Sequence, residues 1–451
     1  MTVGIFVCNN PCILCSMEFP ESTSKPLHIF YQHFLKVLRS FAVFVAMRGL
    51  TCLNFSMNFK EAVKFLKSFV SYEDILLKKY DKEAFNLDRF RKFLRDYDVE
   101  YEKLPCIHIT GSKGKGTAAH LIASYLARAG YKVGLFTSPY ILNIREMIVV
   151  DGKMISEKKF IEYVARMKNF LEKSGRIPSG DVVTYFEMVT AIMFQYFLDE
   201  KVDIAVLEVG LGGRLDSTNV CKSFLTVLTL VEKEHTEILG RTYREILNEK
   251  LGIVKAGIPL IVGPQNKIVL NEIKKRKLGV PVFYVDDVAK TSLMIFLKEK
   301  FDEKLFEKVK SSLRIIGRFQ VEKVDGKTVV FDIAHTPASA KNLRKNLVEK
   351  FPDARLCFLI SMMRFKDVSG FLRGLEGRGN APDKSGLVGK VVFTKSHEAR
   401  GRSGAEMKKF YKKGIVIDDP KKAFQFLLKK LKKNEILVVT GSHFLIGEII
   451  F

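Results

Sequence analysis

A glycine-rich loop between a β-rich run and a helical run constrains this chain most. Residues 106–110 form a short apolar run typical of a strand, and residues 118–129 have the spacing of a helix that ends near Gly130. The loop between them is Gly111-Ser112-Lys113-Gly114-Lys115-Gly116-Thr117. Its backbone N–H groups can turn inward around phosphates, and the N-terminus of the helix adds a favourable dipole. The order strand, loop, helix therefore predicts a phosphate-binding site in an α/β domain.

The side chains of this loop suit phosphate chemistry, although the loop departs from the strict Walker A pattern. Lys115 can reach the β- and γ-phosphates, and the hydroxyl of Thr117 can face a metal ion. With Lys115 as the phosphate lysine, Ile109 stands where Walker A has Gly, and Gly116 stands where it has Ser or Thr. An ordinary glycine-rich turn is the alternative, but the position between a strand and a helix favours a nucleotide site.

Strands and helices alternate along the chain from Met57 onwards. We expect helices over residues 59–69, 87–97, 118–129, 158–173, 186–199 and 338–350. We expect strands over residues 106–110, 132–136, 203–209, 224–230, 258–263, 328–333, 356–360, 390–394, 414–417 and 435–440. The lysine-rich segment 265–313 has no clear pattern, and the segment 374–389, rich in Gly, Lys and Asp, is expected to be an exposed loop.

This alternation predicts an α/β fold with parallel sheets. We expect a P-loop-type, doubly wound ATPase domain over residues 57–313, followed by a smaller Rossmann-like α/β domain over residues 317–451. The length of 451 residues agrees with two or three domains.

The first 56 residues differ from the rest of the sequence. No acidic residue occurs between Ser22 and Asn58, and the longest apolar run, 41–47, is too short to span a bilayer. No n-region, long h-region and cleavage site follow in the order of a signal peptide. A mis-called start, a disordered extension and a targeting segment all remain open. We favour the first, because Met57 opens a sequence that is typical of a domain start.

Charge and cysteine content narrow the possible functions. The formal net charge is +24, from 74 Lys and Arg against 50 Asp and Glu, and the basic residues are spread along the chain. A basic surface or attraction of anionic small molecules is favoured over nucleic-acid binding. Seven cysteines do not suggest a disulfide framework. The spacing Cys8-x3-Cys12-x2-Cys15 occurs in iron–sulfur enzymes, but no segment of barrel length follows it before the loop.

Two further segments place polar residues at the ends of expected strands. Glu208 ends one strand and precedes the glycine-rich residues 210–213, which allow a ligand to approach the backbone. Ligands bind at the carboxyl ends of strands in open α/β sheets, and carboxylate oxygens suit Mg2+. His235 also follows a strand, but a lone histidine is more often a core or surface residue.

Together these segments resemble the folylpolyglutamate synthase and dihydrofolate synthase family of the Mur ligase superfamily. The loop is similar to that family's Gly-Thr-Asn-Gly-Lys-Gly-Ser, and residues 136–139 are similar to its Thr-Ser-Pro-His segment. Further matches lie at residues 184–187, 208–219, 239–242, 249–253, 317–319, 332–335 and 440–442. The resemblance covers residues 57–451, and the run 208–219 is its most specific part.

The resemblance implies an ATP-dependent ligase that joins L-glutamate to a folate, to a dihydropteroate or to both. ATP would phosphorylate a substrate carboxylate, and the amine of glutamate would then displace phosphate. Such chemistry depends on positioning and charge neutralisation. The expected partners are these small molecules, with no nucleic acid and no membrane, and the expected protein is a cytoplasmic monomer.

The resemblance also implies roles for individual residues. Mg2+ would be held by Ser138, Glu208 and His235. The catalytic residues would be Lys115, His235 and Lys250, with Lys250 carbamylated. ATP would contact Gly111, Ser112, Gly114, Lys115, Gly116, Thr117, Arg318, Asp332 and His335. The pterin-bearing substrate would contact Thr184, Tyr185, Phe186, Glu187, Leu215, Asp216 and Ser217.

The sequence departs from this family at several positions. Lys113 stands where the family usually has Asn, Tyr140 where it usually has His, and Thr336 where it usually has Asn. Segment 265–313 lacks the Asn-Ala-Ala stretch of the family, so one nucleotide contact is unassigned. These departures affect which substrate we expect the protein to bind more than which class of reaction we expect it to catalyse.

Three other functions remain as alternatives. A ligase of peptidoglycan synthesis would need an additional N-terminal domain, and only about 50 residues separate Met57 from the loop. A ligase acting on another pterin or on a deazaflavin cofactor would share the ATP site. A non-catalytic, basic nucleotide-binding protein would be expected to lose at least one of Ser138, Glu208, His235 and Lys250.

Overall fold

The computed structural model describes residues 57–69, 87–175, 183–377, 388–398 and 400–450. The expected extension 1–56 and the cysteines at positions 8, 12 and 15 lie outside the described residues. No helix within the described ranges is long and apolar enough to cross a membrane.

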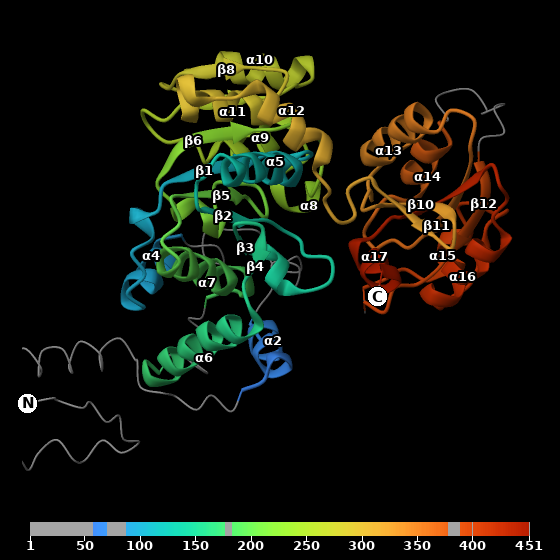
Figure 1. Cartoon of the computed structure of the whole chain (residues 1–451), viewed down its shortest axis with the longest axis horizontal. Coiled ribbons are helices and arrows are strands. Elements are labelled where there is room, and N and C mark those ends of the chain that lie inside the picture. Colours follow the sequence, from blue (N-terminus) through green and yellow to red (C-terminus); the bar gives the residue numbers. More distant parts are fainter. Residues whose placement is uncertain (1–56, 70–86, 176–182, 378–387, 399, 451) are drawn as a thin grey trace, which may run out of the picture. The chain divides into compact units, whose positions relative to one another are not determined.

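An eight-stranded sheet forms the first half of the described chain (Figure 1). Its order is β4-β3-β2-β5-β1-β6-β7-β8. The strands are β1 (Cys106–Thr110), β2 (Val133–Phe136), β3 (Ile148–Val150), β4 (Lys153–Met154), β5 (Ile204–Glu208), β6 (Ser223–Leu228), β7 (Leu260–Val262) and β8 (Val282–Tyr284). The six strands from β2 to β8 in this order are parallel, whereas β3 and β4 form an antiparallel edge. The expected α/β class is confirmed.

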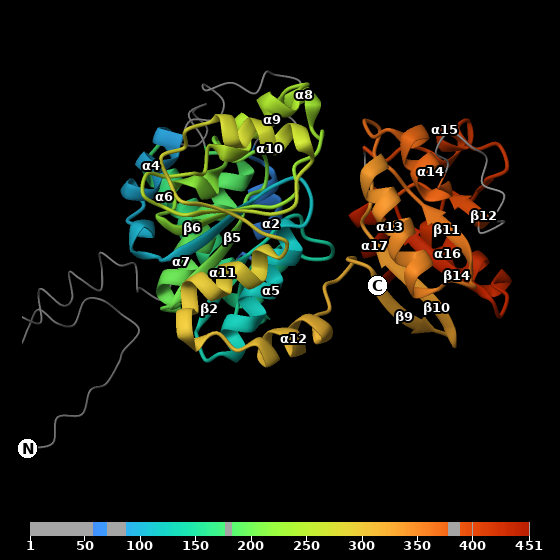
Figure 2. The same cartoon turned by 90° about the horizontal axis from the view of Figure 1, so that it is seen from above.

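Helices cover both faces of this sheet, as Figure 2 shows from above. Successive side chains of a strand point to opposite faces. Ile107 and Ile109 of β1 therefore pack against the first set of helices, and Cys106 packs against the second. The first set is α5 (Lys115–Arg128), α11 (Val288–Leu297) and α12 (Glu303–Ser312). The second set is α2 (Phe59–Lys67), α4 (Leu87–Asp96), α6 (Glu157–Lys173) and α7 (Tyr185–Asp199).

Three shorter helices lie on the chain between β6 and β8. They are α8 (Thr236–Leu239), α9 (Tyr243–Leu251) and α10 (Lys267–Lys275). Helix α9 begins with a capping box, because Thr242 and Glu245 satisfy each other's backbone N–H groups. Leu247 of α9 and Val269 of α10 are fully buried in one apolar cluster with Val262 of β7. This packing fixes α9, which carries Lys250, against the sheet.

A six-stranded sheet forms the C-terminal part, in the order β13-β12-β11-β14-β10-β9. The strands are β9 (Gln320–Val324), β10 (Lys327–Asp332), β11 (Arg355–Ile360), β12 (Val388–Phe393), β13 (Ile415–Val416) and β14 (Glu435–Thr440). All neighbours are parallel except β9, which pairs antiparallel with β10.

Helices also cover both faces of the second sheet. One apolar cluster joins the sheet to α13 (Pro337–Lys350), α14 (Val368–Glu376) and α15 (Gly404–Lys408). The other joins it to α16 (Pro420–Lys430) and α17 (His443–Ile450). The second α/β sheet after residue 317 is therefore confirmed as the sequence predicts it.

The expectation of an exposed loop over 374–389 is wrong at both ends. Helix α14 continues to Glu376 and β12 begins at Val388, while residues 378–387 lie outside the described part. Gly374 indicates a loop in the sequence, but it is buried where α14 meets α13. A Cβ at this position would lie 2.7 Å from the carbonyl oxygen of Pro337. The glycine therefore permits a close contact between helices.

Candidate functional site

Two glycines of the glycine-rich loop have positive φ angles. Gly111 has φ 146°, and a Cβ there would lie 1.9 Å from Oγ1 of Thr229. Gly114 has φ 88° and is the N-cap of α5. Only glycine occupies such conformations readily. The N-terminus of α5 thus opens directly onto the loop, as an anion site requires.

Hydrogen bonds fasten this loop to the chain that follows β6. The backbone N–H groups of Ser112 and Lys113 donate to the carbonyl of Leu230, at 2.7 and 3.2 Å. The hydroxyl of Ser112 donates to the carbonyl of Glu232 and accepts from its N–H, at 3.1 and 3.0 Å. Ser112, expected to contact ATP, is buried and holds the loop in shape.

Two lysines converge on one carbonyl of the loop. The ammonium of Lys115 donates to the carbonyl of Gly111 at 3.0 Å, and the ammonium of Lys250 donates to the same oxygen at 2.8 Å. Lys250 is only 1% exposed. Burial lowers the pKa of Lys250 to about 8, and Glu234 opposes this shift. The structure therefore brings together two of the three residues expected to be catalytic.

Glu234 is a member of the site that sequence reasoning missed. Its carboxylate lies 3.3 Å from the ammonium of Lys250 and 3.6 Å from that of Lys113. Burial alone would raise the pKa of Glu234, but Lys250, Lys115 and Lys113 hold it at about 2. Its position directly before His235 was the one signal in the sequence, but Glu232 and Glu237 lie in the same short segment.

The carboxylate of Glu208 lies at the end of β5, beside the start of α5. The backbone N–H of Ser138 donates to Glu208 Oε2 at 3.2 Å. Burial raises the pKa of Glu208, while Lys115 and Arg318 lower it. A Cβ at Gly116 would lie 3.3 Å from both Glu208 Oε2 and Arg318 Nη2. This crowding explains why glycine replaces the Ser or Thr of Walker A at position 116.

Ser138 and Glu208 together suit a hard cation. A buried carboxylate beside a serine provides oxygen ligands, and a cation there would favour its ionised form. His235 begins α8 with φ 48°, and burial, followed by Lys366, lowers its pKa to about 4, which leaves the ring neutral. Among the described residues, the charged side chains that shift the pKa of His235 are Lys366, Glu234, Glu237 and Lys250. Glu208, the other expected metal ligand, is not among these four. No cluster of three or more His, Cys, Asp or Glu side chains that could hold a metal occurs there.

The expected ATP contacts of the C-terminal part lie around the end of β10. Asp332 accepts from the backbone N–H groups of Phe319 and Ala334, at 2.9 and 2.8 Å. His335 shares a hydrogen bond of 2.9 Å with the carbonyl of Ile333, and burial lowers its pKa to about 3. Thr336 caps α13, a function that Asn also performs, so this departure from the family preserves the helix start.

The expected substrate segment 184–187 forms the N-terminus of α7. Thr184 and Glu187 make a capping box, with hydrogen bonds of 2.6 and 3.2 Å. The guanidinium of Arg89 in α4 also binds both carboxylate oxygens of Glu187, at 3.1 and 3.0 Å. Phe186 is buried and Tyr185 is half-buried, so Tyr185 is the more accessible of the two rings.

The expected substrate residues 215–217 are mostly engaged with the protein itself. Asp216 Oδ2 accepts from the N–H groups of Gly210 and Leu211, both at 3.0 Å, and Oδ1 accepts from the N–H of Thr218 at 3.0 Å. Ser217 shares a hydrogen bond of 2.7 Å with Thr190. Asp216 and Ser217 are each 1% exposed, whereas Leu215 is half-buried. These contacts give Asp216 and Ser217 a structural function, and their substrate contact stays a prediction.

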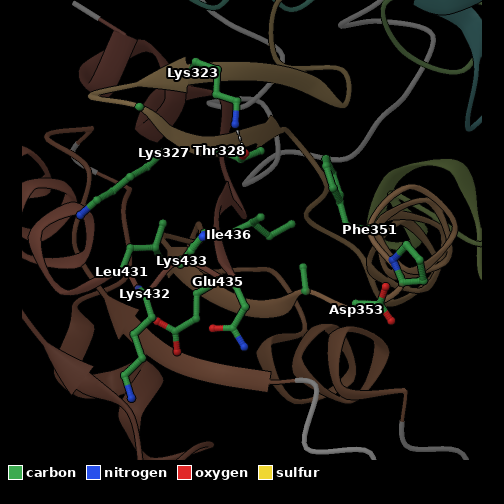
Figure 3. Close-up of a pocket in the computed structure, with 14 residues that line it drawn as sticks. Lys323, Lys327, Thr328, Phe351, Asp353, Leu431, Lys432, Lys433, Glu435 and Ile436 are labelled. Carbon is green, nitrogen blue, oxygen red and sulfur yellow. Dashed lines mark hydrogen bonds between the residues drawn. The ribbon is translucent and has the colours of Figure 1, made fainter.

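The described part of the chain has a cavity in each of its two α/β regions. One, of about 560 Å3, is bordered by Gly116, Ser138, Glu208 and Arg318, which are expected site residues. The other, of about 430 Å3, is lined by residues of the second sheet and its loops. Figure 3 shows that Lys327 and Lys432 at its rim extend away from the other labelled side chains. None of the expected site residues borders this second cavity, so the first is the candidate site.

Two family profiles match this sequence. Residues 109–324 match the Mur ligase middle domain, and residues 317–443 match the glutamate ligase domain of Mur ligases. A dihydrofolate synthase/folylpolyglutamate synthase of Bacillus subtilis is 28% identical over 422 residues, covering 80% of this chain and 94% of the relative. A folylpolyglutamate synthase of Lacticaseibacillus casei is 43% identical over 157 residues, which are 35% of this chain and 37% of the relative.

Solved structures share the fold over almost their whole length. The folylpolyglutamate synthase of Thermotoga maritima has a TM-score of 0.69 and 26% identity, covering 86% of this chain and 95% of that one. The FolC protein of Escherichia coli, solved with DHPP and ADP, has a TM-score of 0.74 and 22% identity, covering 88% and 97%. A bifunctional synthase of Yersinia pestis, solved with AMPPNP and Mn, has a TM-score of 0.73 and 20% identity, covering 87% and 97%.

Proposed function

Because this chain belongs to the Mur ligase family, in its branch of folylpolyglutamate and dihydrofolate synthases, we propose that it uses ATP to join L-glutamate to a folate or to a dihydropteroate. One observation carries the proposal. Lys115 of the glycine-rich loop and the buried ammonium of Lys250 share the carbonyl of Gly111, and the charge of Lys115 also acts on the buried carboxylate of Glu208. The phosphate-binding loop, the carboxylate expected to bind a cation and the buried lysine thus lie together at one edge of the sheet.

The reaction proceeds in two displacements. A carboxylate oxygen of the folate or pteroate bonds to the γ-phosphorus of ATP, and the bond to the bridging oxygen breaks to release ADP. The nitrogen of glutamate then bonds to the acyl carbon, the carbon–oxygen bond to phosphate breaks, and phosphate and a proton leave. No protein nucleophile is needed, so positioning and charge neutralisation supply the catalysis.

The residues of the loop bind and orient the nucleotide. The backbone N–H groups at the start of α5 face the phosphates, and Lys115 exchanges the carbonyl of Gly111 for a phosphate oxygen. Arg318, beside Gly116 and Glu208, adds a positive charge from the C-terminal part of the chain. Ser138, Glu208 and His235 would hold Mg2+. When bound, the ion would supply charge neutralisation on the phosphate oxygens.

Carbamylation of Lys250 is part of this proposal. Its lowered pKa leaves more of the amine neutral, and a neutral amine is the form that combines with carbon dioxide. The new negative charge would lie close to Glu234, which opposes it. Lys115 and Lys113, whose charges also act on Lys250, would offset that repulsion. We also propose that the protein works as a cytoplasmic monomer.

Glutamate incorporation tests the function directly. The full chain is incubated with Mg-ATP, labelled L-glutamate, and either dihydropteroate or tetrahydrofolate as the acceptor. We expect ATP-dependent incorporation with at least one acceptor, and the choice of acceptor separates the two synthase activities. Lys115→Ala, which removes the phosphate lysine, should lower the rate by roughly 100-fold or more. The proposal would be contradicted if glutamate were incorporated into neither acceptor. It would also be contradicted if ATP turnover responded to nucleic acid and not to glutamate.

A further inference from the structure

Lys113 is a second lysine of the phosphate loop, two residues before Lys115. Its backbone is fixed, because its N–H donates to the carbonyl of Leu230 at 3.2 Å and the two residues form an isolated antiparallel bridge. Its side chain is 25% exposed, and its ammonium is 3.6 Å from Oε2 of Glu234. The loop therefore places this charge beside the phosphate site on a rigid support.

The two oxygens of Glu234 are shared between two ammonium groups. Oε2 faces Lys113 from the loop, and Oε1 faces Lys250 from α9 at 3.3 Å. Glu234 is 12% exposed, so solvent compensates its charge only slightly. A buried carboxylate requires a nearby positive charge. The unmodified ammonium of Lys250 provides one, and the charge of Lys115 also acts on Glu234, so Lys113 is not its sole counter-ion.

Positive charge around the loop exceeds negative charge. The charges that act on Lys113 are Glu234, Lys115, Glu232 and Lys366. Lys113 also acts on Asp332, and Lys115 and Arg318 act on Glu208. Five cationic side chains and four carboxylates therefore interact around the loop: Lys113, Lys115, Lys250, Lys366 and Arg318 with Glu232, Glu234, Glu208 and Asp332. Like charges held this close repel one another, and the remaining positive charge suits an anionic phosphate group.

We propose that Lys113 is a direct ligand of the terminal phosphate of a bound nucleoside triphosphate, and that Glu234 is its counter-ion only while this phosphate is absent. The inference rests on the nucleotide-binding part of the proposed function and not on the acceptor substrate. Lys115 bonds to the carbonyl of Gly111 from the start of α5, whereas Lys113 reaches Glu234 from the middle of the loop. On binding, the ammonium of Lys113 moves from Glu234 to a phosphate oxygen.

Calorimetric titration of the full chain with ADP and with a non-hydrolysable triphosphate analogue tests the inference. Lys113→Asn should weaken binding of the triphosphate about tenfold, since a charge-assisted hydrogen bond is lost, and should change ADP binding less than about twofold. Lys113→Arg, which keeps the charge, should bind both within about threefold of the unchanged chain. Lys233→Asn is the matched control, because its ammonium lies over the ring of Tyr243 and it removes the same charge.

The outcomes separate this inference from the proposed function. Equal losses for ADP and the triphosphate, or no loss for either, overturn the assignment of Lys113 to the terminal phosphate. Glu234→Gln provides a second variant: triphosphate binding should be retained or tightened, and a loss of tenfold or more overturns the counter-ion assignment. Neither titration contains folate or glutamate. A chain that shows the expected nucleotide pattern but incorporates no glutamate would refute the ligase function alone.

Discussion

At the scale of single residues, Lys250 connects the loop to the chemistry. We expect Lys250→Ala to lose most of the glutamate incorporation, because it removes both the bond to the carbonyl of Gly111 and the amine that we propose is carbamylated. A short-chain carboxylic acid or bicarbonate should partly restore the rate by supplying the missing anion. Lys267→Ala, at an exposed position in α10, is the control. Activity equal to the unchanged chain would remove Lys250 from the mechanism.

The buried side chain of His335 is expected to make the stability of the folded protein depend on pH. Burial lowers its pKa from 6.5 to about 3. Between these two values the unfolded chain binds a proton that the folded chain does not, so the free energy of unfolding falls as pH falls below about 6.5. His335→Gln should therefore lose less stability than the unchanged chain between pH 7 and pH 5, as measured by urea unfolding at both values. Equal losses would show that the ring is protonated equally in both states.

Residue identity alone does not single out Glu234. Glu232, Glu234 and Glu237 share one short segment, and no pattern in the sequence separates them. What distinguishes Glu234 is its contact with the ammonium groups of Lys113 and Lys250, which come from different elements. The motifs around Lys115, Glu208 and His235 were recognisable, because glycine spacing and strand ends mark them. Charge pairing across elements requires the fold.

At the scale of elements, the N-terminus of α7 depends on a partner in α4. Glu187 has a side chain 4% exposed and pairs with Arg89 at 3.0 Å. Arg89→Met should destabilise the protein by about 3 kcal/mol, because it leaves a buried carboxylate without its cation. Adding Glu187→Gln should recover part of that loss. Chemical denaturation measures both, and an additive effect of the two changes would show that the pair is not coupled.

A fully buried strand such as β14 was predictable, whereas the elements of the lysine-rich segment 265–313 were not. Residues 435–440 were expected as a strand and form β14 over the same range, because all six residues are buried and the four between Glu435 and Thr440 are Ile, Leu, Val and Val. Segment 265–313 gave no clear pattern, yet it forms α10, α11, α12 and β8. These helices have nine or ten residues each, and lysines interrupt their apolar faces. Their stability comes from packing on the sheet.

At the scale of the whole molecule, Gly116 lies where the two sheets contribute to one site. Its backbone is beside Glu208, at the end of β5, and Arg318, just before β9. Gly116→Ser would restore the Walker A residue type at this one position, but its Cβ would crowd both charged groups at 3.3 Å. We expect the KM for ATP to rise about tenfold or more while the protein remains folded. Ala129→Ser, at the exposed end of α5, is the control, and an unchanged KM would contradict the crowding argument.

The division into two α/β sheets followed from the sequence, since the pattern of strands and helices stops at 265–313 and resumes after Gly317. The contribution of Arg318 to the first sheet's site did not follow from any pattern. It was implied only by resemblance, because a contact between residues about 200 positions apart depends on how the chain folds back.

The carbonyl oxygen of Gly111 has two lone pairs, and Lys115 and Lys250 use both. Binding of the nucleotide is therefore expected to exchange one hydrogen bond for another: Lys115 must release the carbonyl of Gly111 before it binds a phosphate oxygen. In the free protein, the carbonyl of Gly111 thus holds the ammonium of Lys115 in the place where a phosphate oxygen is expected to replace it.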